Sequence, residues 1–156
     1  MTTAEGRLAE LGIVIPQLPP PVAVYVPAVR TGRIVYASGQ TPTVDGVLQA
    51  KGKLGEGVTV EEGARAARLA ALNCLAEIRG LLGSLDAVSR VVRVTGFVAS
   101  APGFGEQPYV INGASELMEQ VFGDAGRHAR SAIGVAELPF GAPVEVELIV
   151  EVAEGS

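Results

Sequence analysis

The stretch ARSAIGVAELPFGAPVEVELIVEV (Ala129–Val152) contains two strand-like runs on either side of a turn rich in proline and glycine. We predict strands over Arg130–Ala136 and Pro143–Val152. The second run alternates between apolar and mostly acidic residues, the period of a β-strand with two different faces. One face carries Val144, Val146, Leu148, Val150 and Val152, and the other carries Glu145, Glu147, Ile149 and Glu151.

The acidic face of this strand has two interpretations, and the sequence leaves both open. It is either a solvated outer face or part of a cleft in a surface between subunits. Ile149 interrupts the acidic row, and the preceding strand offers only the small residues Ala132 and Gly134 on the side of Arg130. A sheet face built of small side chains and a few charges favours the cleft.

Arg130 and Glu145 have the chemistry that a cleft for an anionic substrate requires. A guanidinium group is a planar fork that binds both oxygens of a carboxylate and stays charged at any working pH. In a partly dry cleft, desolvation disfavours an ionised glutamate and a nearby arginine favours it, so the group can act as a general base or acid. We therefore predict that Arg130 binds a carboxylate and that Glu145 transfers protons.

The clearest element elsewhere is a helix that begins after Thr59. The segment Thr59–Glu62 is a capping box, in which the threonine hydroxyl accepts the amide of the third helical residue. Small and aliphatic residues then recur every three or four positions as far as Leu82, and Gly83 provides a stop.

The remaining patterns complete an α+β domain. The element order is ββ–α–β–α–ββ, which predicts helices packed on one face of a single sheet. Tyr36 and Phe97 lie on strands and are predicted to be core side chains. The other predicted elements are strands over Val22–Val29, Arg33–Gln40 and Val88–Ala99, a loop over Thr43–Gly57, and a helix over Tyr109–Gly123.

The first 20 residues differ from the rest of the chain. Residues 3–11 suit a short helix, and the proline-rich segment Pro16–Pro21 then prevents a regular hydrogen-bond ladder. We assign residues 1–20 to an N-terminal arm and residues 21–156 to the α+β domain. The N-terminus has neither a basic segment nor a long apolar run, so we predict no signal peptide or membrane span and expect a cytoplasmic protein.

The composition of the 156 residues limits the possible partners. The chain is 48% hydrophobic and 19% charged, with a mean hydropathy of +0.36, which predicts that surface is buried between subunits. A net charge of −5, without a cluster of lysine and arginine, argues against nucleic acid as a ligand. The single cysteine, Cys74, lies in the helical pattern and is predicted to be a buried hydrophobic residue.

Several segments resemble the RidA (YjgF) family of enamine and imine deaminases. The resemblance extends from about Val22 to Val152 and implies a chorismate-mutase-like α+β fold. It further implies an antiparallel-dominated mixed sheet with two helices on one face, and a homotrimer with sites at the subunit interfaces. The segments that carry it are YASGQTP (36–42), the capped helix, RVTGFVAS (93–100), VINGAS (110–115) and, most specific, ARSAIGVAELPFGAPVEVE (129–147).

The resemblance also implies an activity. Members of the family hydrolyse reactive 2-imino and enamine acids, such as 2-aminoacrylate, to 2-oxo acids and ammonia, and they need no cofactor. Arg130 matches the family arginine that binds the substrate carboxylate, and Glu145 matches the glutamate that positions and deprotonates water. The family's other pocket residues match Tyr25, Ser38 and Asn112.

The sequence departs from the family pattern at several points. Ala132 stands where many relatives have a cysteine, and His128 stands where a proline is common. The arm and the loop Gly103–Gln107 are longer than in short members, and Asn112 lies one residue further from the arginine. These differences indicate a divergent subgroup and bear on the expected range of substrates.

Other functions are less well supported, and one rival stays open. The chain has one histidine and no Cys/His cluster for a metal. Gly52–Gly57 lacks the Gly-Lys-Ser/Thr of a phosphate loop, and Ser38 is outside a Gly-x-Ser-x-Gly elbow. The ribonuclease activity attributed to some relatives fits poorly with the negative charge. The serious rival is a non-catalytic trimer that binds small carboxylates or acts as a chaperone-like module, which needs Arg130 but not Glu145.

Overall fold

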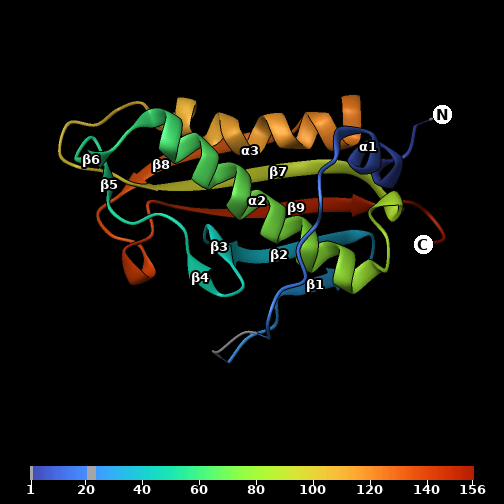
Figure 1. Cartoon of the computed structure of the whole chain (residues 1–156). Coiled ribbons are helices and arrows are strands. Elements are labelled where there is room, and N and C mark those ends of the chain that lie inside the picture. Colours follow the sequence, from blue (N-terminus) through green and yellow to red (C-terminus); the bar gives the residue numbers. More distant parts are fainter. Residues whose placement is uncertain (1, 21–23) are drawn as a thin grey trace.

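The computed structural model describes residues 2–20 and 24–156. Its main sheet has five strands in the order β1-β2-β9-β7-β8, and all pairs are antiparallel except β7–β8. The helices lie on one face of this sheet (Figure 1), which confirms the predicted α+β class. The bounds are β1 Ala28–Thr31, β2 Ile34–Gln40, β7 Val88–Ala99, β8 Ala129–Val135, β9 Val144–Val152, α1 Ala4–Leu11, α2 Val60–Leu82 and α3 Gln107–Phe122.

The first strand corrects the sequence prediction. Residues 24–27 precede β1, which spans Ala28–Thr31, and positions 22 and 23 lie outside the described residues. Proline has no N–H for a ladder, and the carbonyl oxygen of Pro27 instead accepts the Ser38 N–H at 2.8 Å. The turn between β1 and β2 is formed by Gly32 and Arg33, and the two residues before it, Arg30 and Thr31, lie within β1.

The start of α3 and the predicted loop over Thr43–Gly57 also differ from the prediction. Helix α3 begins at Gln107 rather than Tyr109, with Pro108 in its first turn, where a missing N–H costs no hydrogen bond. The segment predicted as a loop contains two short strand pairs, because its turns allow brief ladders: β3 (Thr43–Val44) with β4 (Val47–Leu48), and β5 (Lys53–Leu54) with β6 (Gly57–Val58).

Helix α2 packs closely on the sheet because its inner face is made of small residues. Its start follows the prediction, since the Thr59 hydroxyl accepts the Glu62 N–H at 3.1 Å. Cys74 is fully buried, as predicted, and its thiol donates to the Val146 carbonyl oxygen at 3.1 Å. Burial raises the pKa of this thiol, so it stays protonated. The other small buried residues of this face are Gly63, Ala66, Ala67, Ala70 and Ala71.

The opposite face of the sheet has no helix over it in the part of the chain that the structure describes. Val29, Tyr36 and Ile133 are 50%, 48% and 44% exposed there. Tyr36 is therefore not the core residue that the sequence predicted, while Phe97 is partly buried. The strand pattern showed that these residues alternate with buried ones, but it did not show which face the helices would cover.

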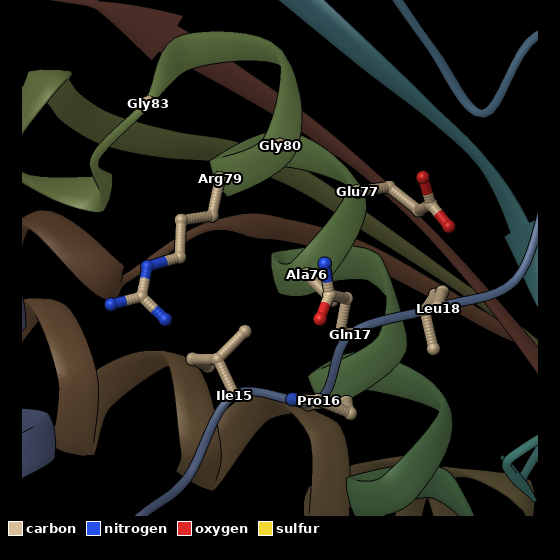
Figure 2. Close-up of a pocket in the computed structure, with 9 residues that line it drawn as sticks. All are labelled: Ile15, Pro16, Gln17, Leu18, Ala76, Glu77, Arg79, Gly80 and Gly83. Atoms are coloured by element: carbon tan, nitrogen blue, oxygen red, sulfur yellow. The ribbon is translucent and has the colours of Figure 1, made fainter.

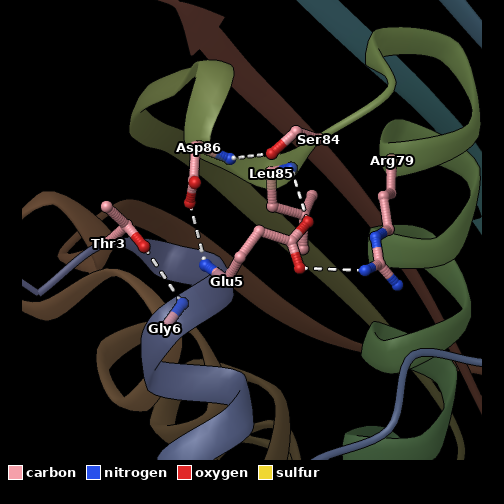
Figure 3. A network of polar contacts seen from close by, with 7 residues as sticks. All are labelled: Thr3, Glu5, Gly6, Arg79, Ser84, Leu85 and Asp86. Carbon is pink, nitrogen blue, oxygen red and sulfur yellow. Dashed lines mark hydrogen bonds and ion pairs between the residues drawn. The ribbon is translucent and has the colours of Figure 1, made fainter.

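Polar contacts fix the N-terminal helix α1 to the last turn of α2 and to the segment that follows α2 (Figure 3). The Glu5 carboxylate pairs with the Arg79 guanidinium at 3.0 Å and accepts the Leu85 N–H at 3.0 Å. The Glu5 N–H donates to the Asp86 carboxylate at 2.9 Å. Two apolar side chains, Ala4 and Leu8, are buried in the same core as the sheet and helices.

After α1 the chain runs along α2 and leaves a cavity of about 540 Å³ between the two segments (Figure 2). Ile15 and Leu18 line it from the arm, and Glu77 and Arg79 line it from α2. Burial raises the pKa of Glu77. The arm therefore forms part of the packed structure over the outer side of α2.

The contact between α2 and α3 depends on Gly113, because a Cβ atom there would lie 2.0 Å from the carbonyl oxygen of Ala64. We expect Gly113→Ala to lower the free energy of unfolding by about 1–3 kcal/mol, through overpacking against backbone. Gly80→Ala is the matched control, since nothing lies within 4 Å of that Cβ position. Removing a helix glycine there should raise stability by about 0.5–1 kcal/mol. Thermal and urea unfolding measure both, and equal effects would contradict this account of the helix contact.

Candidate functional site

Arg130 extends from the edge strand β8 toward α3. In the sheet register Arg130 pairs with Val94, which pairs with the buried Leu148, so the arginine lies on the face that the helices cover. Its Nη1 donates to the Asn112 Oδ1 at 2.8 Å and to the Ser115 Oγ at 3.1 Å. The structure thus brings together Arg130 and Asn112, two of the predicted site residues.

Helix periodicity explains why two side chains meet the guanidinium. Asn112 and Ser115 are three residues apart on α3 and therefore project from the same face. Gly113 lies on another face and lets α3 approach α2, as described above. The Arg130 Nη2 makes a longer contact of 3.4 Å with the Pro108 carbonyl oxygen at the start of the helix. We call Arg130, Asn112 and Ser115 the arginine half-site.

A cavity of about 360 Å³ adjoins this half-site and includes Asn112 and Ser115 in its wall. His128 also lines the cavity and contacts the Ser115 Oγ through its Nε2 at 2.9 Å. Sequence reasoning assigned no role to Ser115 or His128. The three-residue spacing from Asn112 was an available signal for Ser115, and the departure from the family proline was the signal for His128. The remaining lining residues are Glu116, Glu119, Gly126 and Arg127.

Glu145 lies on the other face of the sheet, where it pairs with Phe97 of β7. Burial raises the pKa of its carboxyl group, and the negative charge of Glu147 raises it further. The carboxylate rests against the backbone of Gly39, because a Cβ atom at that glycine would lie 2.6 Å from the Glu145 Oε2. We call Glu145 and Gly39 the glutamate half-site.

Ser38 and Tyr25 have different surroundings. The Ser38 hydroxyl donates to the Val26 carbonyl oxygen at 2.7 Å and so ties the segment before β1 to β2. Tyr25 is 51% exposed and lines a small cavity of about 80 Å³ with Gln40 and Glu77. Ser38 directly precedes Gly39 of the glutamate half-site, whereas Tyr25 borders the arm.

Within one protomer the two half-sites are separate. Arg130 of β8 is in register with Val94 of β7 and with Leu148 of β9, and Glu145 lies three residues before Leu148 on β9. Two strand spacings across the sheet and three residues along it place the Arg130 and Glu145 Cα atoms on the order of 14 Å apart. Their side chains also leave opposite faces. The sequence interpretation that put Arg130 on the glutamate side of the sheet is therefore wrong for a single copy of the chain. Alternation within each strand shows which residues share a face, but it does not show which faces of two different strands lie on the same side of the sheet.

Most of the chain, from within α1 to the end of β9, matches the model of a known protein family. Residues 5–152 match the family described as "YjgF/chorismate_mutase-like, putative endoribonuclease". The chain therefore belongs to the YjgF family, which the sequence resembled.

Three similar proteins extend over nearly the full chain. Protein TCP17 of Trypanosoma cruzi is 48% identical over 95% of this chain and 96% of its own. A structure from Agrobacterium tumefaciens is 46% identical, with a TM-score of 0.87 over 96% of this chain and 92% of that one. One from Shewanella oneidensis is 33% identical, with a TM-score of 0.92 over 96% and 99%. These alignments include most of the arm.

Shorter members of the fold align less completely. The structure of Escherichia coli TdcF with bound serine is 24% identical and covers 88% of this chain and 94% of that one, at a TM-score of 0.63. This likeness shows the common fold. No helix among residues 2–20 and 24–156 is both long and apolar enough to cross a membrane.

The contact between Glu145 and Gly39 can be measured as a coupling energy. We expect Gly39→Ala to destabilise the wild-type chain, because the new methyl group and the carboxylate cannot share the same space. In a Glu145→Ala background the same substitution should cost much less. Urea unfolding of the four chains should give a coupling of about 0.5–3 kcal/mol. Strictly additive effects would show that the two residues are independent.

Proposed function

We propose that this protein hydrolyses reactive 2-imino and enamine acids to 2-oxo acids and ammonia. In this proposal it acts as a homotrimer, and each site combines the arginine half-site of one copy with the glutamate half-site of another. Arg130 binds the substrate carboxylate, and Glu145 activates water. Tyr25, Ser38 and Asn112 complete the pocket.

The observation that supports the proposal most strongly is that the Arg130 guanidinium is held by neutral groups and not by a carboxylate. Within residues 2–20 and 24–156 it has no ion-pair partner. Neutral acceptors, Asn112 and Ser115, hold it in place instead. A fixed, partly buried cation with neutral neighbours is suited to bind an anion. Binding then costs little side-chain entropy, because the arginine is already ordered, and it breaks no existing ion pair.

The position of Glu145 supports a site shared between copies. The Glu145 carboxylate cannot reach a substrate held at Arg130 of the same chain, because the two Cα atoms are about 14 Å apart and the side chains leave opposite faces of the sheet. That face also exposes Val29, Tyr36 and Ile133, which an associated copy would bury. The family resemblance implies a trimer, and its three interfaces would each assemble one site.

The reaction follows from the two groups. Arg130 holds the carboxylate of the iminium acid, so that C2 faces water positioned by the ionised Glu145 of the other copy. Glu145 takes a proton from this water while the oxygen forms a bond to C2, and the electron pair of the C=N bond moves to nitrogen. Glu145 then gives this proton to the amino nitrogen. The C–N bond breaks as the hydroxyl oxygen loses its proton to the Glu145 carboxylate and forms the C=O bond of the 2-oxo acid. Glu145 passes that proton to the departing ammonia, which leaves as ammonium.

A non-catalytic carboxylate-binding module is the second candidate. The arginine half-site favours it, because the contacts to Asn112 and Ser115 are complete without Glu145. The two candidates differ in what the loss of the Glu145 carboxylate does. The module would keep its function, and the enzyme would lose it.

Mixing two inactive variants tests the shared site directly. We expect Arg130→Ala and Glu145→Ala each to reduce ammonia release from dehydratase-generated imino acids by about 100-fold or more, the loss typical of a general acid–base group. Trimers assembled from equal amounts of both variants should recover about a quarter of the wild-type rate. A site is then intact only where its arginine comes from the Glu145→Ala copy and its glutamate from the Arg130→Ala copy, which random association produces at about a quarter of the interfaces.

Glu147→Gln mixed with Arg130→Ala is the matched control, in which one partner retains both catalytic groups. Size-exclusion chromatography with light scattering verifies that each variant still assembles. If both variants assemble and are inactive, and their mixture recovers no ammonia release, then the site is not shared between copies or the roles of Arg130 and Glu145 are wrong. Full activity of Glu145→Ala would rule out Glu145 as the base, and a wild-type protein that accelerates ammonia release from no imino acid would favour the binding module.

The pH profile provides a separate test of Glu145 as the base. Only the ionised carboxylate accepts a proton, so the rate should fall as the pH drops through the pKa of Glu145, which lies above its ordinary value of 4.5. Removing the adjacent negative charge in Glu147→Gln should lower that pKa and move the acid limb of the profile to lower pH. An acid limb that stays in place would assign it to another group.

A further inference from the structure

His128 lies at the end of a hydrogen-bond chain that leads to Arg130. Its Nδ1 is 2.6 Å from the Gly126 carbonyl oxygen, and its Nε2 is 2.9 Å from the Ser115 Oγ. The same Ser115 oxygen is 3.1 Å from the Arg130 Nη1. The mechanism proposed above uses the arginine but neither the imidazole nor the serine.

The Gly126 carbonyl and the Arg130 guanidinium, at the two ends of this series of hydrogen bonds, fix which group donates in each bond. A carbonyl oxygen only accepts, so the Nδ1 of His128 carries the proton. In the neutral ring the Nε2 is then an acceptor, and the Ser115 hydroxyl donates to it. A guanidinium only donates, so the lone pairs of the Ser115 oxygen face Arg130. The neutral imidazole thus orients the serine in the way that the arginine requires.

The electrostatic surroundings keep the imidazole neutral. Burial lowers the pKa of His128, and the charge of Arg130 lowers it further, while the Gly126 carbonyl acts in the opposite direction. His128 also borders a second cavity, of about 560 Å³, on the side of β7 and β9. The other charged groups around the two cavities are Glu116 and Glu119 from α3, Arg127 beside the ring, Arg90 from β7 and Glu151 from β9.

We propose that His128, acting through Ser115, positions the Arg130 guanidinium and couples carboxylate binding at Arg130 to protonation of the imidazole. This inference rests on the proposed carboxylate site. A bound carboxylate would neutralise the cation that disfavours a charged imidazole. A protonated His128 would donate to the Ser115 oxygen, whose second lone pair still accepts from Arg130, so the contact that holds the guanidinium is kept. By reciprocity, protonation of His128 then strengthens carboxylate binding, so affinity should increase as the pH falls through the titration of the ring.

The chain contains one histidine, which makes the coupling directly measurable. Its imidazole C–H signal can be followed by NMR during a pH titration of the full-length protein. We expect millimolar pyruvate to raise the pKa of His128, and pyruvamide, which lacks the carboxylate, to leave it unchanged. Arg130→Gln should raise the pKa without ligand and abolish the effect of pyruvate.

Arg127→Gln is the matched control for charge. Arg127 is adjacent to His128 in sequence, but its side chain is 73% exposed, so solvent screens it and the substitution should shift the titration much less than Arg130→Gln. Identical titrations of wild type and Arg130→Gln would overturn the coupling. A shift in Arg130→Gln with no response to pyruvate would support the hydrogen-bond chain and contradict the carboxylate site.

Two substitutions of His128 separate positioning from a purely structural role. Glutamine keeps a side-chain oxygen acceptor for the Ser115 hydroxyl but does not titrate, whereas leucine removes the acceptor. We expect His128→Leu to weaken pyruvate binding about 3- to 10-fold, the scale of one lost hydrogen bond. His128→Gln should bind nearly as the wild type at neutral pH, with no dependence on pH in the range where histidine titrates. Equal losses in both variants, with the fold intact by circular dichroism, would overturn the positioning role.

Discussion

The strict alternation of β9 is the constraint on which the rest of the structure depends. This strand lies between β2 and β7, and every second side chain from Val144 to Val152 is almost completely buried under the helices. A shift of one residue would place the glutamates in the apolar core, which their desolvation would forbid. The same alternation therefore fixes the register of the sheet and commits Glu145 to the uncovered face.

Glycines and small residues set the distances that this register requires. Gly96 of β7 leaves room for Ile111 of α3, and Gly113 allows α3 to meet the backbone of α2. These approaches bring α3 over the edge strand β8, so that Asn112 and Ser115 reach Arg130. The geometry of the arginine half-site is thus a consequence of core packing, and a substitution in the core would displace it.

Local patterns in the sequence predicted much of this arrangement. The capped helix, the central strands and the buried cysteine follow from periodicity and capping chemistry alone. Arg130 and Glu145 were predicted as site residues from their chemistry and from the family resemblance, and Asn112 from the resemblance alone. What could not be predicted is the relation between separate strands: the pairing that turns Arg130 toward the helices, the late start of β1 after Pro27, and the exposure of Tyr36. Those features depend on contacts between distant segments, which a pattern within one segment does not encode.

The separation of Arg130 from Glu145 in one protomer has a chemical consequence. A guanidinium and a carboxylate in the same partly buried cleft would form an ion pair, and a substrate carboxylate would have to break it before binding. Here neutral acceptors orient the cation, and the Glu145 carboxyl group lies apart from it on a face where burial and Glu147 raise its pKa. If the two halves meet only across an interface, with substrate between them, the arginine is satisfied by the substrate and the glutamate remains free to take a proton. Assembly would then create the reactive site and keep its two charges from neutralising each other.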